Sequence, residues 1–590
     1  MAVESKHLTR AATLAEVRAA GCLPVRVDGH TLALFADGER VYAVDNRCPH
    51  LGFPLHRGTV CDGILTCHWH HARFDLASGG TFDQWADDVR AFPVEVRDGQ
   101  VWVDLTPPAD VQAHQRRRLR DGLERNIPLV IAKQVIPLVE AGAAAETFRI
   151  GLEFGTRYRQ AGWGQGLTML TCLMNLLPYL AAEDRPLALY HGLAAVARDC
   201  DGMAPRFTVQ PLPGDAADLA TLRRWFRQFV AVRDAEGAER CIVSALRAGA
   251  GDRQMAAMLF AAATDHRYIQ AGHVLDFTNK ALEALDIAGW PAAEAVLTSL
   301  APAYAGASRM EESNAWRHPV DLVAIVEDAF EQLPAALAEG AAQAGRWAGQ
   351  DELTATLLDG EPRAAAAALL AALRAGCRPI ELAGAVADAA ALRIARFHTS
   401  NEFGDWDTAL HTFTFANAVE QGLRRMDGLA DADGPALLLR GVFDAAMSVY
   451  LDRFLNVPPA RLPAPEARPG AAAAALAELP GLLDRSQQVD AAGRLVAAVF
   501  ADPAAGPGAA DDLLARLGHL LLREDRDFHT IQTVEAASRQ FRLRRGTPAA
   551  AHALIAAARY LAAHAPTLRA QGQTYQIAQR LHRGERLYDE

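Results

Sequence analysis

Two short stretches decide the fold of the N-terminal part of this chain: residues 48–50 are Cys-Pro-His, and residues 67–70 are Cys-His-Trp-His. Together they form the pattern C-x-H-x16-C-x2-H, in which each stretch offers one thiol and one imidazole. Thiolates and imidazoles are ligands of transition metals, so the pattern predicts a metal centre rather than a disulfide. The predicted ligands are Cys48, His50, Cys67 and His70.

The sequence around these stretches alternates apolar and polar residues from 20 to 106. Asp-Gly pairs that begin at Asp28, Asp37, Asp62 and Asp98 interrupt the alternation. Apolar alternation broken by Asp-Gly pairs is typical of β-hairpins. The two metal-binding stretches therefore belong to a small antiparallel β domain.

Two loops that each carry one Cys and one His can hold a [2Fe–2S] cluster, with both thiolates on one iron and both imidazoles on the other. A Cys2His2 zinc site is the alternative, but zinc fingers space their ligands as C-x2–4-C and H-x3–5-H. With Pro49 and Gly52 in the first loop and Phe74-Asp75 after the second, residues 10–106 resemble the Rieske family.

The resemblance is to Rieske-type ferredoxins and to the Rieske domains of oxygenases. High-potential Rieske proteins carry a further Cys in each loop, whereas Phe53 and Trp69 stand at those positions here. The resemblance implies that His50 and His70 lie at the exposed edge of the domain, where electrons leave. Because a Rieske cluster transfers single electrons without bond chemistry, the function depends on what the cluster reduces.

Beyond Thr106 the strand pattern stops, and Ala, Leu and Arg recur at helical spacing. The sequence thus predicts an α+β multidomain protein, in which a small antiparallel β Rieske domain precedes a large all-α helical domain with internal repeats. The predicted parts are the Rieske domain at 1–107, a linker at 108–125 and the helical domain at 126–590, with an internal Pro/Ala-rich linker at 457–474.

The helical part contains an internal repeat. The pattern His-x3-Phe-x-Asn-x5-Leu starts at His273 and again at His411, in each case downstream of the string ALRAG. Looser copies surround His191 and His529. A chance similarity between Ala-rich helices is the alternative explanation.

On a helix, His266, His273 and Lys280 recur every seven residues and share one stripe, with a drift of about 20° per heptad. Burying several titratable groups is costly, and helical bundles offset this cost by binding metal between helices. We therefore predict a second metal site, although core histidines without metal remain the alternative. Its predicted ligands are His191, His266, His273, His411 and His529.

Lys280 and His266 are the predicted catalytic residues. A desolvated lysine has a lowered pKa and can act as a base, or it can form a carbamate that supplies a metal with an oxygen ligand. A surface lysine that extends its ammonium into solvent is the alternative.

The helical part also resembles the questin oxidase family. The resemblance covers about residues 125–570 and rests on the strings DHRYIQ (265–270), DW (405–406) leading into LHTFT (410–414), and ARYLAAH (558–564). It implies the oxidation and opening of aromatic polyketide rings, such as anthraquinones, without a flavin. The closely spaced His pair of Rieske oxygenase catalytic domains is not found here, which makes that architecture improbable.

Composition excludes several partners. Acidic residues outnumber basic ones, 71 to 59, and the net charge of −12 gives no drive towards nucleic acid or anionic lipid. The N-terminus lacks the apolar region of a signal peptide, and no apolar stretch is long enough to span a bilayer, so we expect a cytoplasmic protein without a membrane partner. Lysine is scarce, occurring only as Lys6, Lys133 and Lys280.

These observations predict an oxidoreductase in which the Rieske cluster passes electrons to a mononuclear non-haem metal, with iron favoured, for the O2-dependent oxidation or ring cleavage of an aromatic or quinone-like substrate. No dinucleotide-binding fingerprint is present, so a separate ferredoxin or flavin reductase is expected to supply the electrons. One alternative is a Rieske electron carrier fused to a non-catalytic helical scaffold that docks partners. Another is cofactor-independent oxygenation with a regulatory Rieske domain.

Overall fold

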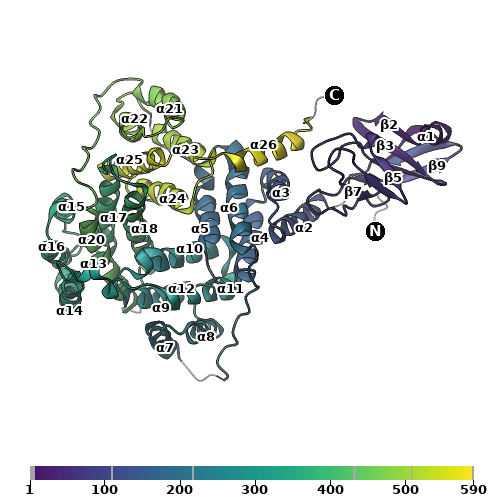
Figure 1. The fold of residues 1–590 in the computed structure, drawn as a ribbon. Helices are drawn as coiled ribbons and strands as arrows, with labels where there is room; N and C mark the ends of the chain where they lie inside the picture. The colour runs from purple at the N-terminus through teal and green to yellow at the C-terminus, as the bar shows by residue number, and fades with distance from the viewer. Residues whose placement is uncertain are drawn as a thin grey trace. The chain divides into compact units, whose positions relative to one another are not determined.

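The computed structural model describes residues 7–107, 110–214, 218–429, 433–506, 508–585 and 587. The chain divides into two compact units (Figure 1). The first unit joins the residues up to Thr147 with those from Ala570 onward, and the second is Phe148–Arg569.

Antiparallel strands make up most of the N-terminal part of the first unit. Within the described residues they form three sheets, with the orders β1-β10-β9, β2-β3-β4-β8 and β5-β6-β7. The strands are β1 (Leu8–Thr13), β2 (Cys22–Val27), β3 (His30–Asp37), β4 (Arg40–Asp45), β5 (Thr59–Cys61), β6 (Ile64–Thr66), β7 (Arg73–Asp75), β8 (Ala91–Phe92), β9 (Val94–Arg97) and β10 (Gln100–Asp104). The predicted small antiparallel β domain is confirmed.

Three of the four Asp-Gly pairs form two-residue hairpin turns, as their sequence predicts, whereas Asp37 ends β3 and pairs with Arg40. Asp28-Gly29 joins β2 to β3, and both residues have positive φ, 45° and 84°. Asp62 and Asp98 begin equivalent two-residue turns between β5 and β6 and between β9 and β10. Two-residue turns with positive φ match the right-handed twist of the strands, which explains why Asp-Gly is favoured there.

Helices predominate in the described chain after β10, which confirms the predicted large helical region after the Rieske domain; α1 lies within the β domain. They are α1 (Leu14–Ala20), α2 (Val111–Glu124), α3 (Pro128–Glu140), α4 (Ala144–Arg157), α5 (Gln165–Leu176), α6 (Arg185–Cys200), α7 (Leu219–Ala231), α8 (Ala235–Arg247), α9 (Asp252–Thr264), α10 (His273–Ala288), α11 (Ala293–Thr298), α12 (Ala301–Gly306), α13 (Asn314–Arg317), α14 (Leu322–Ala341), α15 (Gln350–Asp359), α16 (Pro362–Arg374), α17 (Pro379–Ala395), α18 (Phe403–Arg425), α19 (Asp433–Leu438), α20 (Arg440–Asp452), α21 (Ala471–Leu482), α22 (Val489–Ala501), α23 (Ala509–Leu522), α24 (Phe528–Leu543), α25 (Pro548–Ala563) and α26 (Ala570–His582). Short 3-10 helices are η1 (Leu55–Arg57), η2 (Leu177–Tyr179), η3 (Ala182–Asp184), η4 (Ile269–Gly272), η5 (Trp290–Ala292) and η6 (Met310–Glu312).

The stretch 108–125 differs from the linker that we predicted. It contains helix α2, whose residues Arg118, Leu119 and Leu123 are buried. The Arg118 guanidinium donates to Asp87 Oδ1 at 2.7 Å and to the backbone oxygen of Ala86 at 2.8 Å, so the helix is attached to the β domain. The helical domain also does not begin at 126 as a separate body, because α3 and the C-terminal α26 pack against each other in the first unit.

The stretch 457–474, which we predicted as a linker, combines an irregular segment with the start of a helix. Residues 457–468 form no helix or strand, whereas α21 begins at Ala471. Within the described residues, no helix is both long enough and apolar enough to cross a membrane.

Four helices of the second unit form a closed ring. Helix α10 packs against α5 and α18, and α24 also packs against α5 and α18, so these segments lie side by side although α5 and α24 are far apart in sequence (Figure 1). The two copies of the predicted repeat lie on α10 and α18. His273 is the first residue of α10, whereas His411 lies inside α18, so the copies have different positions relative to their helix ends.

We expect Arg118→Ala to release α2 from the β domain. The Arg118 side chain is 4% exposed and pairs with Asp87, so its removal leaves buried acceptors without their donor and costs about 3 kcal/mol of local stability. Hydrogen–deuterium exchange of the α2 amides should therefore become faster by roughly a hundredfold. Arg120→Ala, at an exposed position of the same helix, is the control and should leave exchange unchanged. Equal exchange rates in both variants would show that Arg118 does not attach α2 to the β domain.

Candidate functional site

Two loops at the end of the short sheets carry the four ligands predicted in the β domain. Cys48 and His50 follow β4, and Cys67 and His70 lie between β6 and β7. Backbone hydrogen bonds close each loop: Gly52 N donates to Cys48 O at 2.7 Å, and Cys67 N donates to Ala72 O at 2.9 Å. The two loops therefore hold their ligands on fixed backbone.

The structure brings the four side chains together. The Cys48 and Cys67 sulfurs are buried and share a hydrogen bond, which lowers the pKa of Cys67 to about 6 and raises the pKa of Cys48. The rings of His50 and His70 lie edge to face, with centroids 4.7 Å apart. His50 is half-buried and His70 is exposed, so one of the two imidazoles reaches solvent.

This donor set fits a [2Fe–2S] cluster. Burial, with the charges of Lys133 and His70, lowers the pKa of His50 to about 4, so the imidazole is neutral at pH 7 as a metal ligand must be. His50 Nδ1 is buried and has no hydrogen-bond partner among the described residues. A buried ring nitrogen without a hydrogen-bond partner, in the loop that also carries Cys48, is available as a metal ligand. Cys48, His50, Cys67 and His70 are therefore the residues that would hold the cluster.

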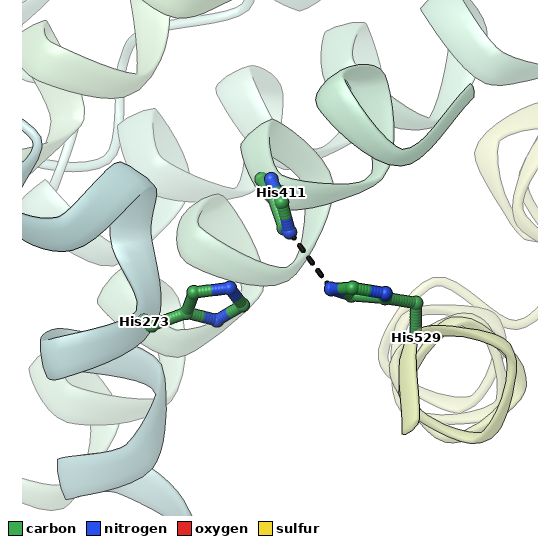
Figure 2. A group of neighbouring side chains, drawn as sticks. All are labelled: His273, His411 and His529. Carbon is green, nitrogen blue, oxygen red and sulfur yellow. Dashed lines mark hydrogen bonds between the residues drawn. The ribbon is translucent and has the colours of Figure 1, made fainter. Parts of the chain in front are cut away.

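Three of the five histidines predicted as ligands in the helical part converge. His273 begins α10, His411 lies in α18 and His529 is the second residue of α24, and the three rings point towards one another (Figure 2). One ligand nitrogen from each lies within 4.8 Å of the others, and His411 Nε2 is 3.0 Å from His529 Nε2. We call His273, His411 and His529 the histidine triad.

The other two predicted ligands lie elsewhere. His191 Nε2 is 2.9 Å from the backbone oxygen of Leu522, and His266 Nδ1 is 2.8 Å from Glu311 Oε1. His266 precedes α10 in an irregular loop, so the heptad stripe drawn through His266 and His273 does not exist. The helical spacing failed here because the chain is not helical between the two residues.

The environment of the histidine triad favours neutral imidazoles. Burial, with the neighbouring His411 and His529, lowers the pKa of His273 to about 3, and burial with His529 lowers the pKa of His411 to about 4. Phe277 and Phe528 pack against the His273 ring and form an apolar wall. Neutral imidazoles in such a site are ligands for iron, zinc, copper or nickel.

Carboxylates lie near Nδ1 of His529, whereas its Nε2 faces His411. Asp527 Oδ2 is 3.5 Å from His529 Nδ1, and Asp407 Oδ2 is 4.0 Å from the same atom. Asp407 Oδ1 also accepts the Tyr560 hydroxyl hydrogen bond at 2.5 Å. Carboxylates at Nδ1 orient a ligating imidazole and direct its Nε2 towards the metal.

Sequence reasoning missed these carboxylates, although a signal existed for both. Asp407 precedes His411 by four residues, which places both on one face of α18. Asp527 is the N-cap of α24, where its side chain accepts the backbone N–H of Thr530 at 2.9 Å.

A strained loop leads into His273. Tyr268, Gln270 and Ala271 have φ of 40°, 52° and 49°, a conformation that L-residues rarely adopt. The buried ion pair between Arg267 and Asp444, at 3.1 Å, anchors the start of this loop. Strain held by such contacts is a common feature of functional sites.

Lys280 is neither the catalytic lysine that we predicted nor the surface lysine that was the alternative. It is 1% exposed, and its Nζ lies 3.0 Å from Glu283 Oε2 and 2.5 Å from Glu535 Oε2. Burial alone would lower the pKa of Lys280, but the two carboxylates outweigh it and raise the pKa above its usual value. An ammonium held in this way is a poor base and a poor acceptor of carbon dioxide, and it is not a surface lysine. Its position instead supports a structural role, in which it joins α10 to α24.

A cavity of about 900 Å³ lies at the start of α24, where Asp527 faces Nδ1 of His529; the three triad histidines themselves do not line it. Its walls include Asp527 and Thr530 at the start of α24, Trp406 of α18, and His564 after α25. Asp527 thus borders both the cavity and His529. The volume is in the range of pockets that bind small organic ligands.

We expect Lys280→Met to destabilise the second unit. The substitution leaves Glu283 and Glu535 buried together with Arg539 as their remaining cation, a change that costs about 3 kcal/mol. Urea unfolding followed by circular dichroism measures this loss. Adding Glu535→Gln to Lys280→Met should restore part of the stability, because it removes one of the two buried negative charges. Additive losses in the double variant would show that the pair does not interact.

Comparison with known proteins supports the site formed by the two Cys-His loops of the β domain. Residues 7–93 match the Rieske [2Fe–2S] domain family. Human apoptosis-inducing factor 3 is 29% identical over 154 residues, which are 26% of this chain and 24% of that protein. The ferredoxin component of the naphthalene 1,2-dioxygenase system of Pseudomonas putida is 28% identical over 97 residues, 16% of this chain and 93% of the ferredoxin.

Among solved structures, the ferredoxin of carbazole 1,9a-dioxygenase from Nocardioides aromaticivorans shares 28% identity, over 17% of this chain and 98% of that one, with a TM-score of 0.16. The chain therefore spans about a quarter of apoptosis-inducing factor 3 but nearly all of the small ferredoxins. The family match and the similarity to the naphthalene dioxygenase ferredoxin, together with the paired thiols and imidazoles of the two loops, identify residues 7–93 as a Rieske [2Fe–2S] domain, joined in this chain to a large helical region.

Proposed function

We propose that this chain is an oxidoreductase of questin oxidase-like type, in which electrons from the Rieske cluster reach a mononuclear metal held by His273, His411 and His529. The observation that carries the proposal is the convergence of these three imidazoles from three separate helices. Iron is the metal that we favour, because imidazole ligands suit it and a one-electron donor is part of the same chain.

The residues of the site have distinct roles in this proposal. Asp527 and Asp407 orient His529 through its Nδ1, which leaves Nε2 for the metal. Phe277 and Phe528 limit the access of water to His273. When bound, a mononuclear iron supplies the redox chemistry for O2 activation, and the cluster supplies electrons one at a time.

The cavity that Asp527 borders is the proposed substrate site; Asp527 connects it to His529, since the triad histidines do not line the cavity. Its volume of about 900 Å³ accommodates an aromatic or quinone-like molecule, and Asn401 Nδ2, which is buried without a hydrogen-bond partner among the described residues, can donate a hydrogen bond to it. Two of the strings that resemble the questin oxidase family contribute residues here: Trp406 comes from the second and His564 from the third. The similarity to the ferredoxin component of the naphthalene 1,2-dioxygenase system supports O2 as the oxidant, and a separate reductase is the electron donor in this proposal.

We expect the purified chain to contain metal in excess of the two cluster irons. His273→Ala and His411→Ala should each lower the excess metal by roughly tenfold or more, because each removes one of three ligands, and should leave the electron paramagnetic resonance signal of the reduced cluster intact. Metal analysis of each variant measures the loss. His398→Ala is the control, since His398 bonds to Ser400 away from the histidine triad.

The alternatives give different results. Wild-type protein that holds only the cluster irons, with His273→Ala unchanged in metal content, would indicate an electron carrier on a helical scaffold. Turnover without any electron donor would indicate oxygenation that does not use the cluster. Either result would overturn the proposal.

A further inference from the structure

One of the few lysines of the chain lies against the cluster site. Lys133 is half-buried on helix α3, outside the residues that match the Rieske family. Its Nζ donates hydrogen bonds to the backbone oxygen of Pro49 and, at 2.9 Å, to that of His50. Both carbonyls belong to the loop that carries Cys48 and His50, which we call the first ligand loop. Helix α3, which lies outside residues 7–93, therefore forms hydrogen bonds with this loop.

Other residues of the first unit hold the same loop. The Arg47 guanidinium donates to the backbone oxygens of Leu581 at 3.2 Å and Glu585 at 3.0 Å. Gly52 has φ of +84°, and a Cβ there would lie 3.3 Å from Leu581 Cδ2, so α26 also approaches the loop closely. Since α26 packs against α3, the first ligand loop is attached to a pair of helices from distant parts of the chain.

The position of the Lys133 ammonium is important because reduction would add one negative charge to the cluster. A cluster with two ferric ions, two sulfides, two thiolates and two neutral imidazoles is uncharged when oxidised and carries one negative charge after it accepts an electron. A fixed cation nearby stabilises the reduced form more than the oxidised form. Lys133 also interacts with the charges of Cys48 and His50, whereas Asp87 partly offsets its charge and Arg47 and Arg118 add to the positive potential.

We propose that Lys133 is a positioning residue of the cluster, which holds the first ligand loop through the carbonyls of Pro49 and His50 and raises the reduction potential of the bound cluster. The step that it influences is the gain of one electron from an external reductant, with no bond made or broken. The proposal concerns the Rieske site alone and does not depend on a metal at the histidine triad.

The test compares Lys133→Gln, Lys133→Arg and Arg120→Gln in the full chain. Arg120→Gln removes the same charge from an exposed position of α2 and serves as the matched control. Dithionite titration followed by electron paramagnetic resonance gives the midpoint potential at one pH and ionic strength. We expect Lys133→Gln to shift the potential to more negative values by several times the shift of Arg120→Gln, and to change the g values of the reduced cluster. Lys133→Arg should stay close to wild type.

For variants that bind too little cluster for a titration, iron and sulfide analysis measures the amount of cluster per chain. Loss of the cluster in Lys133→Gln but not in Lys133→Arg supports the positioning role, because only the charge and its donor capacity separate the two. A Lys133→Gln potential equal to that of Arg120→Gln, or equal loss of cluster in both Lys133 variants, would overturn the proposal.

Discussion

The buried ion pairs between α10 and α24 are the constraint on which the helical site depends. Lys280 of α10 lies between Glu283 of the same helix and Glu535 of α24, and Arg539 and Asn175 complete the contacts of these carboxylates. A buried charge is tolerated only with its partner in place, so the relative positions of the two helices are set within narrow limits.

One consequence is the geometry at the N-terminal ends of the same helices. His273 begins α10 and His529 lies at the start of α24, so the alignment that pairs Lys280 with Glu535 also brings these two imidazoles together. A hydrogen bond from Gln532 to Asp276 lies along the two helices between the imidazoles and the Lys280–Glu535 ion pair. His411 completes the histidine triad because α18 packs against both helices. These buried polar contacts between α10 and α24 thus fix how the two helices are aligned along their axes, whereas Ala-rich helices alone would permit many alignments.

The Rieske part reaches its ligand geometry in a different way. Asp-Gly turns and short strands present two loops, and backbone hydrogen bonds within each loop orient one Cys and one His. The β core behind them includes Phe35, Leu65 and Phe74 and buries both thiols. Contacts from α3 and α26 then hold the first loop from outside the β domain, so the helices after the ferredoxin-like part are structural components of the same unit.

The sequence alone determined the local features: the β-hairpins, the change to helices after Thr106, and the two Cys-His pairs of the Rieske loops, because turn chemistry and ligand spacing depend on residues close together in the chain. It indicated His273, His411 and His529 through the repeat, but it also selected His191 and His266, which bond elsewhere. Spacing along a chain shows which residues share a helix face and does not show where a helix starts or what packs on it. Only the tertiary structure decided that α2, α3 and α26 join the Rieske unit and that Lys280 is a buried ion-pair partner, because the groups that bind Lys280 and Lys133 include residues 255 and 83 positions away, and long-range packing alone brings them together.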